Sequence, residues 1–156
     1  PVFTFLVSDL SVTSLFFAMG LNENIAAVRK DLGTHSQKIF IAYFKKFPQH
    51  QDHFANYKGK SPDSLTSVGK FPGHVKDVVK MLLEVAERSG DAGKLAADAQ
   101  TLKNMPQHAQ LSTTEFRDLF TTLVPYLKDN VGGCDTAAWE AAGAKIVSAL
   151  KTAGMP

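Results

Sequence analysis

Residues 71–90 read FPGHVKDVVKMLLEVAERSG, and the spacing of their apolar side chains guides the interpretation of the whole chain. Apolar residues recur at intervals of three and four, whereas charged residues fall largely on the opposite side. This pattern predicts a long amphipathic helix that ends at the turn marked by Gly90 and Gly93. Its apolar stripe contains Phe71, His74, Val75, Val78, Val79, Leu82, Val85 and Ala86. One histidine, His74, therefore lies within an apolar face.

The segments after this helix also have helical patterns. A weaker apolar repeat over residues 95–105 leads to His108, and Pro106 is expected to distort the helix there. The run Ser112-Thr113-Thr114-Glu115 is a capping box that opens a further helix ending at residues 131–133. Pro125 is expected to kink or interrupt that helix. Asp135 or Thr136 starts the last helix. The inward positions of these two helices are Phe116, Leu119, Phe120, Leu123, Leu127, Trp139, Ile146, Val147 and Leu150.

The segments before residue 71 predict two more helices and a connection. The first helix carries Ile25, Val28 and Leu32 and is expected to end at Gly33. Thr34 is expected to cap the second, which stops at Pro48. Residues 49–59 have no period and predict an irregular connection, followed by an N-cap with proline at 61–62. No stretch alternates with the period of a strand, so the chain is predicted to be all-α.

Length and composition predict one globular domain. The chain has 156 residues, of which 44% are hydrophobic and 21% charged, and its net charge is +2. This balance excludes the strongly basic surface of a nucleic-acid-binding protein. The single cysteine, Cys134, excludes an internal disulfide and a cysteine-rich zinc site, and it has no basic neighbour that would make it reactive. No apolar run is long enough to span a membrane.

Residues 1–20 are expected to be an N-terminal extension of the domain formed by residues 21–156. They are apolar, lack lysine and arginine, and are interrupted by Asp9, so a secretory signal is not supported. If the natural start is Met19, Asn24 occupies the position where an acylation motif requires serine or threonine. The expected location is therefore cytoplasmic.

Three of the five histidines are predicted to be ordinary solvated side chains. His50 and His53 have the spacing of metal ligands, but no carboxylate or thiol joins them in the sequence. They fall in the segment that is expected to be irregular and polar. His35, near a helix start, is interpreted in the same way.

The other two histidines, His74 and His108, favour a haem site. Each belongs to an apolar helical segment, and aromatic residues are available from earlier segments. Two imidazoles facing each other across an apolar slot suit an iron macrocycle, with one bound to iron and the other facing the ligand. Zinc would require more donors, and a nucleophile elbow for serine catalysis is absent. A haem-free helical interaction domain remains the alternative.

From about Asn24 to Met155 the chain resembles the globins, and more narrowly the dehaloperoxidase-type haemoglobins of terebellid marine worms. The matching stretches are RKDLGTHSQKIFIAYFKKFP, NYKGKSPDSL, KFPGHVKDVVKMLLEVAERSGDAGKLAADAQTL, HAQLSTTEFRDLFTTLVPYL and KIVSALKTAGM. The resemblance implies about eight helices around non-covalent haem b. It also implies that His108 is the proximal iron ligand and His74 the distal histidine. Phe54, Val78, Leu102 and Met105 would complete the haem site, with the carbonyl of Leu102 accepting a hydrogen bond from His108.

The same resemblance implies two activities. His74 would donate a hydrogen bond to dioxygen, or act as acid and base when hydrogen peroxide drives the oxidation of halophenols. The phenol pocket would be lined by Phe40, Phe54, Val78 and Leu119, with Tyr57 near its rim as a candidate radical site. A homodimer is implied as well. The chain departs from the pattern at Val75, Val79, Leu82 and Leu83, which changes the expected shape of the phenol pocket.

Overall fold

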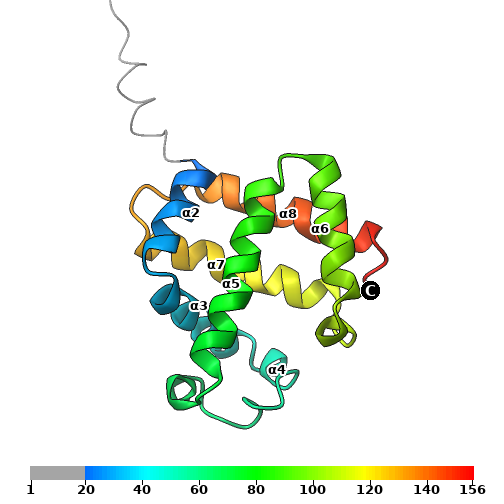
Figure 1. The fold of residues 1–156 in the computed structure, drawn as a ribbon. Coiled ribbons are helices and arrows are strands. Elements are labelled where there is room, and N and C mark those ends of the chain that lie inside the picture. Colours follow the sequence, from blue (N-terminus) through cyan, green and yellow to red (C-terminus); the bar gives the residue numbers. More distant parts are fainter. Residues whose placement is uncertain (1–19) are drawn as a thin grey trace, which may run out of the picture.

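The computed structural model describes residues 20–156, which form a helical domain without strands (Figure 1). The predicted extension, residues 1–20, lies outside the described residues except for Gly20, which is the N-cap of the first helix. No helix between residues 20 and 156 is long and apolar enough to cross a membrane. The elements are α2 (Leu21–Lys30), α3 (Leu32–Lys46), α4 (Pro48–Gln51), η1 (Pro62–Ser67), α5 (Phe71–Arg88), α6 (Ala92–Asn104), η2 (Pro106–His108), α7 (Thr113–Asn130) and α8 (Thr136–Thr152), where η marks a 3-10 helix.

The long amphipathic helix is confirmed as α5, which packs against α3 and crosses the molecule in Figure 1. Part of its apolar stripe packs in the core and part lines a cavity. Phe71, Val75 and Val79 are fully buried in the core. His74 and Val78 lie at the edge of that stripe, one helical turn apart, and line a cavity described below.

The boundary between the first two helices differs from the prediction. The break falls at Asp31, with φ −138° and ψ 53°, and Gly33 lies inside α3. Gly33 and Thr34 were therefore wrongly interpreted as a helix stop and a cap. Glycine lowers helix stability by only about 1 kcal/mol relative to alanine, so packing of the buried residues can override it. The predicted irregular connection likewise contains a short helix, α4.

Pro106 and Pro125 were both predicted to disturb a helix. α6 ends at Asn104 and the 3-10 helix η2 starts at Pro106, as expected from the missing amide donor. At Pro125, α7 continues without interruption, and a kink there stays a prediction. Burial of Leu123 and Leu127 on either side of the proline holds the helix together. The capping box of Ser112 and Glu115 and the start of α8 after Asp135 are confirmed.

A buried polar side chain fastens α2 to the start of α8. The Oδ1 atom of Asn24 accepts hydrogen bonds from the Nε1–H of Trp139 at 3.2 Å and from the backbone N–H of Asp135 at 3.0 Å. Asn24 is fully buried. Since the indole is fully buried as well, this contact supplies the partner that its N–H requires.

The contact between α7 and α8 depends on a glycine. A Cβ atom at Gly143 would lie 2.8 Å from Cγ and 2.9 Å from Cδ1 of buried Phe120. We expect Gly143→Ala to lower the free energy of unfolding by roughly 1–3 kcal/mol, because overpacking outweighs the better helix propensity of alanine. Urea denaturation followed by circular dichroism measures this change.

Gly33→Ala is the matched control, because Gly33 is also helical and a Cβ atom there meets nothing within 4 Å. This variant is expected to be as stable as the parent or more stable by up to about 1 kcal/mol. Equal stabilities of the two variants would contradict the assignment of close packing at Gly143.

Candidate functional site

A cavity of about 420 Å³ opens between α3, α5, the η2 segment and α7. Its volume lies within the range of about 300–1,000 Å³ that is typical of small-molecule sites. All of the residues predicted to surround the haem or a phenol line this one cavity, with Tyr57 as the exception. They are Phe40, Phe54, His74, Val78, Leu102, Met105, His108 and Leu119.

His108 is positioned by the backbone of the preceding helix. Its Nδ1 atom lies 2.7 Å from the carbonyl oxygen of Leu102, which is the predicted acceptor. A carbonyl can only accept, so Nδ1 carries the proton and Nε2 has a free lone pair. The ring also meets Phe116 edge-on, with centroids 5.5 Å apart. This half-buried imidazole is therefore held in one tautomer and presents Nε2 as a metal-binding atom.

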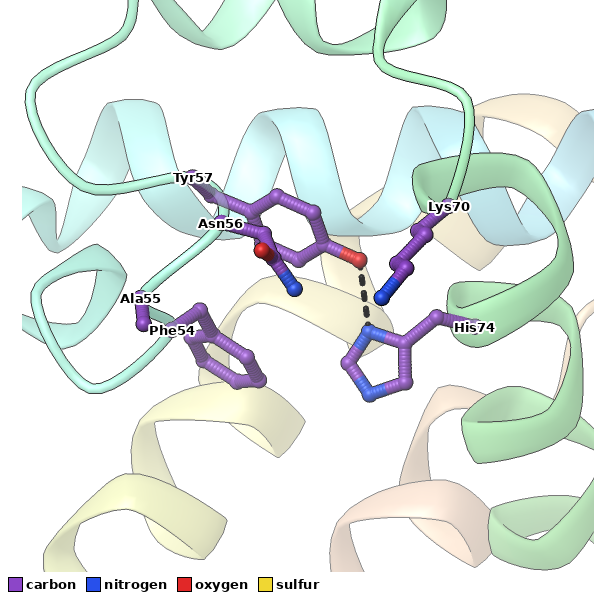
Figure 2. A pocket seen from close by; sticks show the side chains of 6 residues that line it. All are labelled: Phe54, Ala55, Asn56, Tyr57, Lys70 and His74. Carbon is purple, nitrogen blue, oxygen red and sulfur yellow. Dashed lines mark hydrogen bonds between the residues drawn. The ribbon is translucent and has the colours of Figure 1, made fainter.

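His74 is positioned by a tyrosine. Its Nδ1 atom lies 2.7 Å from the hydroxyl of Tyr57 (Figure 2). Desolvation lowers the pKa of His74 although the charge of Asp77 opposes this, and burial raises the pKa of Tyr57. Both groups are therefore neutral at neutral pH. Tyr57 donates when Nε2 bears the imidazole proton and accepts when Nδ1 bears it, so in either tautomer Nε2 is the unengaged nitrogen.

Tyr57 does not lie at the rim of the large cavity. Only 2% of the residue is exposed, and its ring stacks on Phe54 with centroids 5.7 Å apart. It lines a second cavity of about 270 Å³, shared with Phe54, Lys70 and His74 (Figure 2). Because Phe54 and His74 line both cavities, they form the partition between them.

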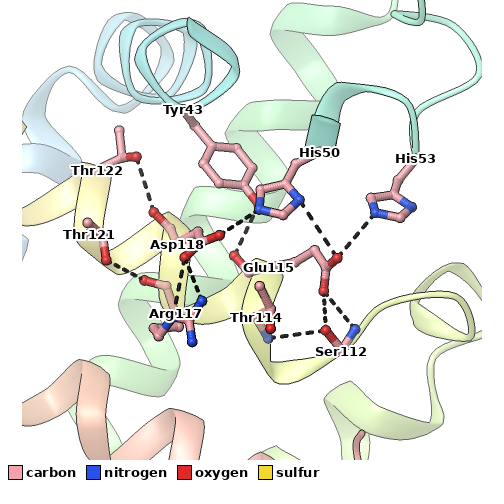
Figure 3. Close-up of polar contacts among 10 residues, drawn as sticks. All are labelled: Tyr43, His50, His53, Ser112, Thr114, Glu115, Arg117, Asp118, Thr121 and Thr122. Atoms are coloured by element: carbon pink, nitrogen blue, oxygen red, sulfur yellow. Dashed lines mark hydrogen bonds and ion pairs between the residues drawn. The ribbon is translucent and has the colours of Figure 1, made fainter. Parts of the chain in front are cut away.

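The interpretation of His50 as a solvated histidine is wrong, whereas His53 is exposed as predicted. His50 is 3% exposed, and its Nε2 atom lies 2.8 Å from Oδ2 of Asp118 (Figure 3). His53 Nε2 lies 3.2 Å from Oε1 of Glu115. Asp118 is 68 positions from His50 in the sequence, so only the packing of α4 against α7 brings them together. His35 is half-buried and its Nδ1 lies 2.7 Å from the hydroxyl of Tyr126, so it is not merely solvated.

Glu115 carries a negative charge beside these histidines. Burial raises the pKa of Glu115, but hydrogen bonds from Ser112 and the nearby His50 together lower it below its ordinary value. The carboxylate is therefore ionised at neutral pH. The capping box pointed to Glu115 as a helix-capping residue, but nothing in the local sequence indicated that it faces two histidines.

Further cavity residues were missed from the sequence. On α5, Met81 and Val85 continue the edge begun by His74 and Val78, at spacings of three and four residues. That spacing was visible in the sequence and could have assigned them to the cavity. Tyr43 also lines it, and only the tertiary structure shows this.

A family model described as Globin matches residues 37–150. The chain belongs to the globin family. Among curated relatives, this globin is 27% identical over 123 residues to a globin of Nerita albicilla, covering 75% of this chain and 77% of the relative. It is 31% identical over 118 residues to globin CTT-VIIB-6 of Chironomus thummi thummi, covering 72% of this chain and 73% of the relative.

The fold of this globin is shared with solved myoglobin structures. Ferric Aplysia limacina myoglobin, in a structure describing its binding of azide, superposes with a TM-score of 0.77 at 22% identity. The match covers 88% of this chain and 97% of that myoglobin. A double mutant of the same myoglobin matches with a TM-score of 0.77 and 23% identity, covering 86% of this chain and 93% of that chain.

Membership of the globin family implies a haem cofactor, and the residues of the cavity fit one. Its walls are largely apolar, as a porphyrin requires, and two imidazoles with free Nε2 atoms belong to them. No Cys-x-x-Cys-His motif occurs in the sequence. The lining of the cavity therefore fits a haem group.

Proposed function

We propose that this globin holds haem b non-covalently within residues 21–156 and binds dioxygen reversibly. The observation that carries the proposal is the pair of histidines lining one apolar cavity, each with its Nδ1 atom engaged and its Nε2 atom free. Haem, when bound, would supply an iron that can take one ligand from the protein and one small ligand such as dioxygen.

His108 is the residue proposed to bind the iron, through Nε2. The hydrogen bond from its Nδ1–H to the Leu102 carbonyl orients the ring and raises the basicity of Nε2. A neutral carbonyl increases that basicity less than a carboxylate would. This partner therefore favours reversible oxygen binding over cleavage of an O–O bond.

His74 is the residue proposed to retain oxygen. When its proton is on Nε2, the ring can donate a hydrogen bond to the partial negative charge on dioxygen. Tyr57 then donates to Nδ1 and fixes the direction of the ring, while Phe54 lies beside it with centroids 5.8 Å apart. The lowered pKa keeps His74 neutral, so one nitrogen donates while the other accepts.

A second candidate function is the peroxide-dependent oxidation of halophenols, to which the resemblance to dehaloperoxidase-type haemoglobins points. The contact between Tyr57 and His74 favours it, because Tyr57 can also accept from Nδ1–H and leave Nε2 bare. A bare Nε2 can take a proton from hydrogen peroxide and later return it. Phe40, Val78 and Leu119 offer the apolar wall against which a phenol ring could pack.

One experiment addresses both functions. The haem-loaded protein is reduced, exposed to air and then deoxygenated, and its absorption spectrum is recorded at each step. We expect the ferrous spectrum to return after deoxygenation, and rapid oxidation to the ferric form in air would overturn reversible binding. Peroxide and trichlorophenol are then added beside an ordinary myoglobin. A turnover no faster than that of the myoglobin would overturn the second function and leave oxygen binding unaffected.

A further inference from the structure

Besides His74 and His108, three other side chains of the cavity wall bring metal-binding atoms close together. They are His50 at the end of α4, His53 two residues after that helix, and Glu115 in the first turn of α7 (Figure 3). One donor atom from each lies within 4.8 Å of the others. His50 Nδ1 is 3.7 Å, and His53 Nε2 is 3.2 Å, from Oε1 of Glu115.

The other polar side-chain atoms of His50 and Glu115 are already engaged. Oε2 of Glu115 accepts hydrogen bonds from the backbone N–H of Ser112 at 2.8 Å and from its hydroxyl at 2.7 Å. Nε2 of His50 lies 2.8 Å from Oδ2 of Asp118. The remaining atoms, Oε1 of Glu115 and Nδ1 of His50, face each other, and His53 Nε2 approaches the same Oε1 atom.

The buried Nδ1 atom of His50 has no hydrogen-bond partner among the described residues. A buried polar atom without a partner destabilises the folded chain, because the atom loses its hydrogen bonds to water on burial. Nδ1 of His50 lies 3.7 Å from Oε1 of Glu115, which is too far for a hydrogen bond between them. A cation between these two atoms would supply the missing partner of Nδ1.

We propose that His50 Nδ1, His53 Nε2 and Glu115 Oε1 form a binding site for a zinc-type divalent metal ion. Two imidazoles and one carboxylate, with a water as fourth ligand, are a known zinc ligand set. With metal–ligand distances of about 2.0–2.2 Å, tetrahedral donors lie about 3.3 Å apart. The two distances to Glu115 are close to that value, and partly exposed His53 can adjust its rotamer.

The surroundings support this geometry. A metal-binding histidine typically donates its other N–H to a carboxylate, and Asp118 occupies that position for His50. Tyr43 stacks on the His50 ring with centroids 5.4 Å apart and donates a hydrogen bond to the carbonyl of Glu115 at 3.0 Å. The ring is therefore oriented before a metal ion binds. Binding would join residues 50–53 to α7.

The test is a calorimetric titration of the full-length, haem-loaded protein with zinc chloride, after dialysis against a chelator and then chelator-free buffer. We expect one zinc ion per chain. His53→Ala is expected to weaken binding at least tenfold. This variant changes the most exposed ligand, with 33% of its side chain accessible, and should leave the fold intact. His35→Ala is the matched control, because His35 is the histidine outside both sites, and its affinity should equal that of the parent.

A second measurement examines the ligands directly. The zinc K-edge absorption spectrum of the parent should contain two imidazole nitrogens in the metal shell, and that of His53→Ala only one. Zinc should also raise the unfolding temperature of the parent but not of His53→Ala, because a ligand stabilises the state that binds it. The proposal is overturned if the parent takes up no zinc at millimolar concentration, or if His53→Ala binds zinc as tightly as the parent.

Discussion

Replacing His108 by alanine is expected to abolish normal haem ligation. The variant loses the imidazole that is proposed to bind the iron and that the Leu102 carbonyl orients. Changes that affect only a hydrogen-bond partner of a metal-binding residue typically lower metal affinity by about 10–100-fold, so loss of the ligand itself should exceed 100-fold. Transfer of haem to an apomyoglobin acceptor, followed in the Soret region, measures this loss.

Two additions make the His108 experiment specific. Free imidazole can diffuse into the vacated space, so it should restore the absorption spectrum of the variant but leave the parent unchanged. His35→Ala should retain haem as the parent does, because its ring contacts Tyr126 outside the cavity. An unchanged haem spectrum of His108→Ala without imidazole would overturn the assignment of His108 as the iron ligand.

Replacing His74 by leucine is expected to accelerate the release of oxygen. Hydrogen bonds to charged groups are worth about 1.5–3 kcal/mol, which corresponds to a rate of dissociation roughly 10–100-fold higher. Leucine keeps the apolar contact with the cavity but removes the Nε2–H donor. Stopped-flow displacement of oxygen by carbon monoxide gives the dissociation rate.

Tyr57→Phe provides a graded comparison with His74→Leu. It preserves the donor but removes the hydroxyl that lies 2.7 Å from Nδ1, so the His74 ring loses its orienting contact. We expect a dissociation rate between those of the parent and His74→Leu. An unchanged rate in His74→Leu would show that this imidazole does not hold oxygen, whereas an unchanged rate in Tyr57→Phe alone would exclude only the positioning role of the hydroxyl.

The helices that the sequence predicted most closely are those specified by local interactions. α5 was predicted from the spacing of its apolar residues, and α7 from its capping box, because both features involve residues within one or two helical turns. The break between α2 and α3 was placed wrongly. There the glycine and threonine preferences are small compared with the packing of the helices, and the chain breaks at Asp31 instead.

The sequence alone determined the all-α fold and the two histidines of the proposed haem site. His74 and Val78 share a helix face at a spacing of four, and His108 follows the helix that contains its partner Leu102. These relations are fixed by the geometry of a single helix or of its end. The resemblance to globins then supplied the expectation that both histidines border one cavity.

Only the tertiary structure decided which side chains contact one another in and behind the cavity wall. Tyr57 is buried behind His74, and His50 and His53 meet Glu115, although the sequence placed all three in an irregular segment. Such contacts depend on where α4 and the following loop settle against α5 and α7. No periodicity along the chain encodes that position, because the energy that fixes it comes from burying side chains distant in sequence against one another.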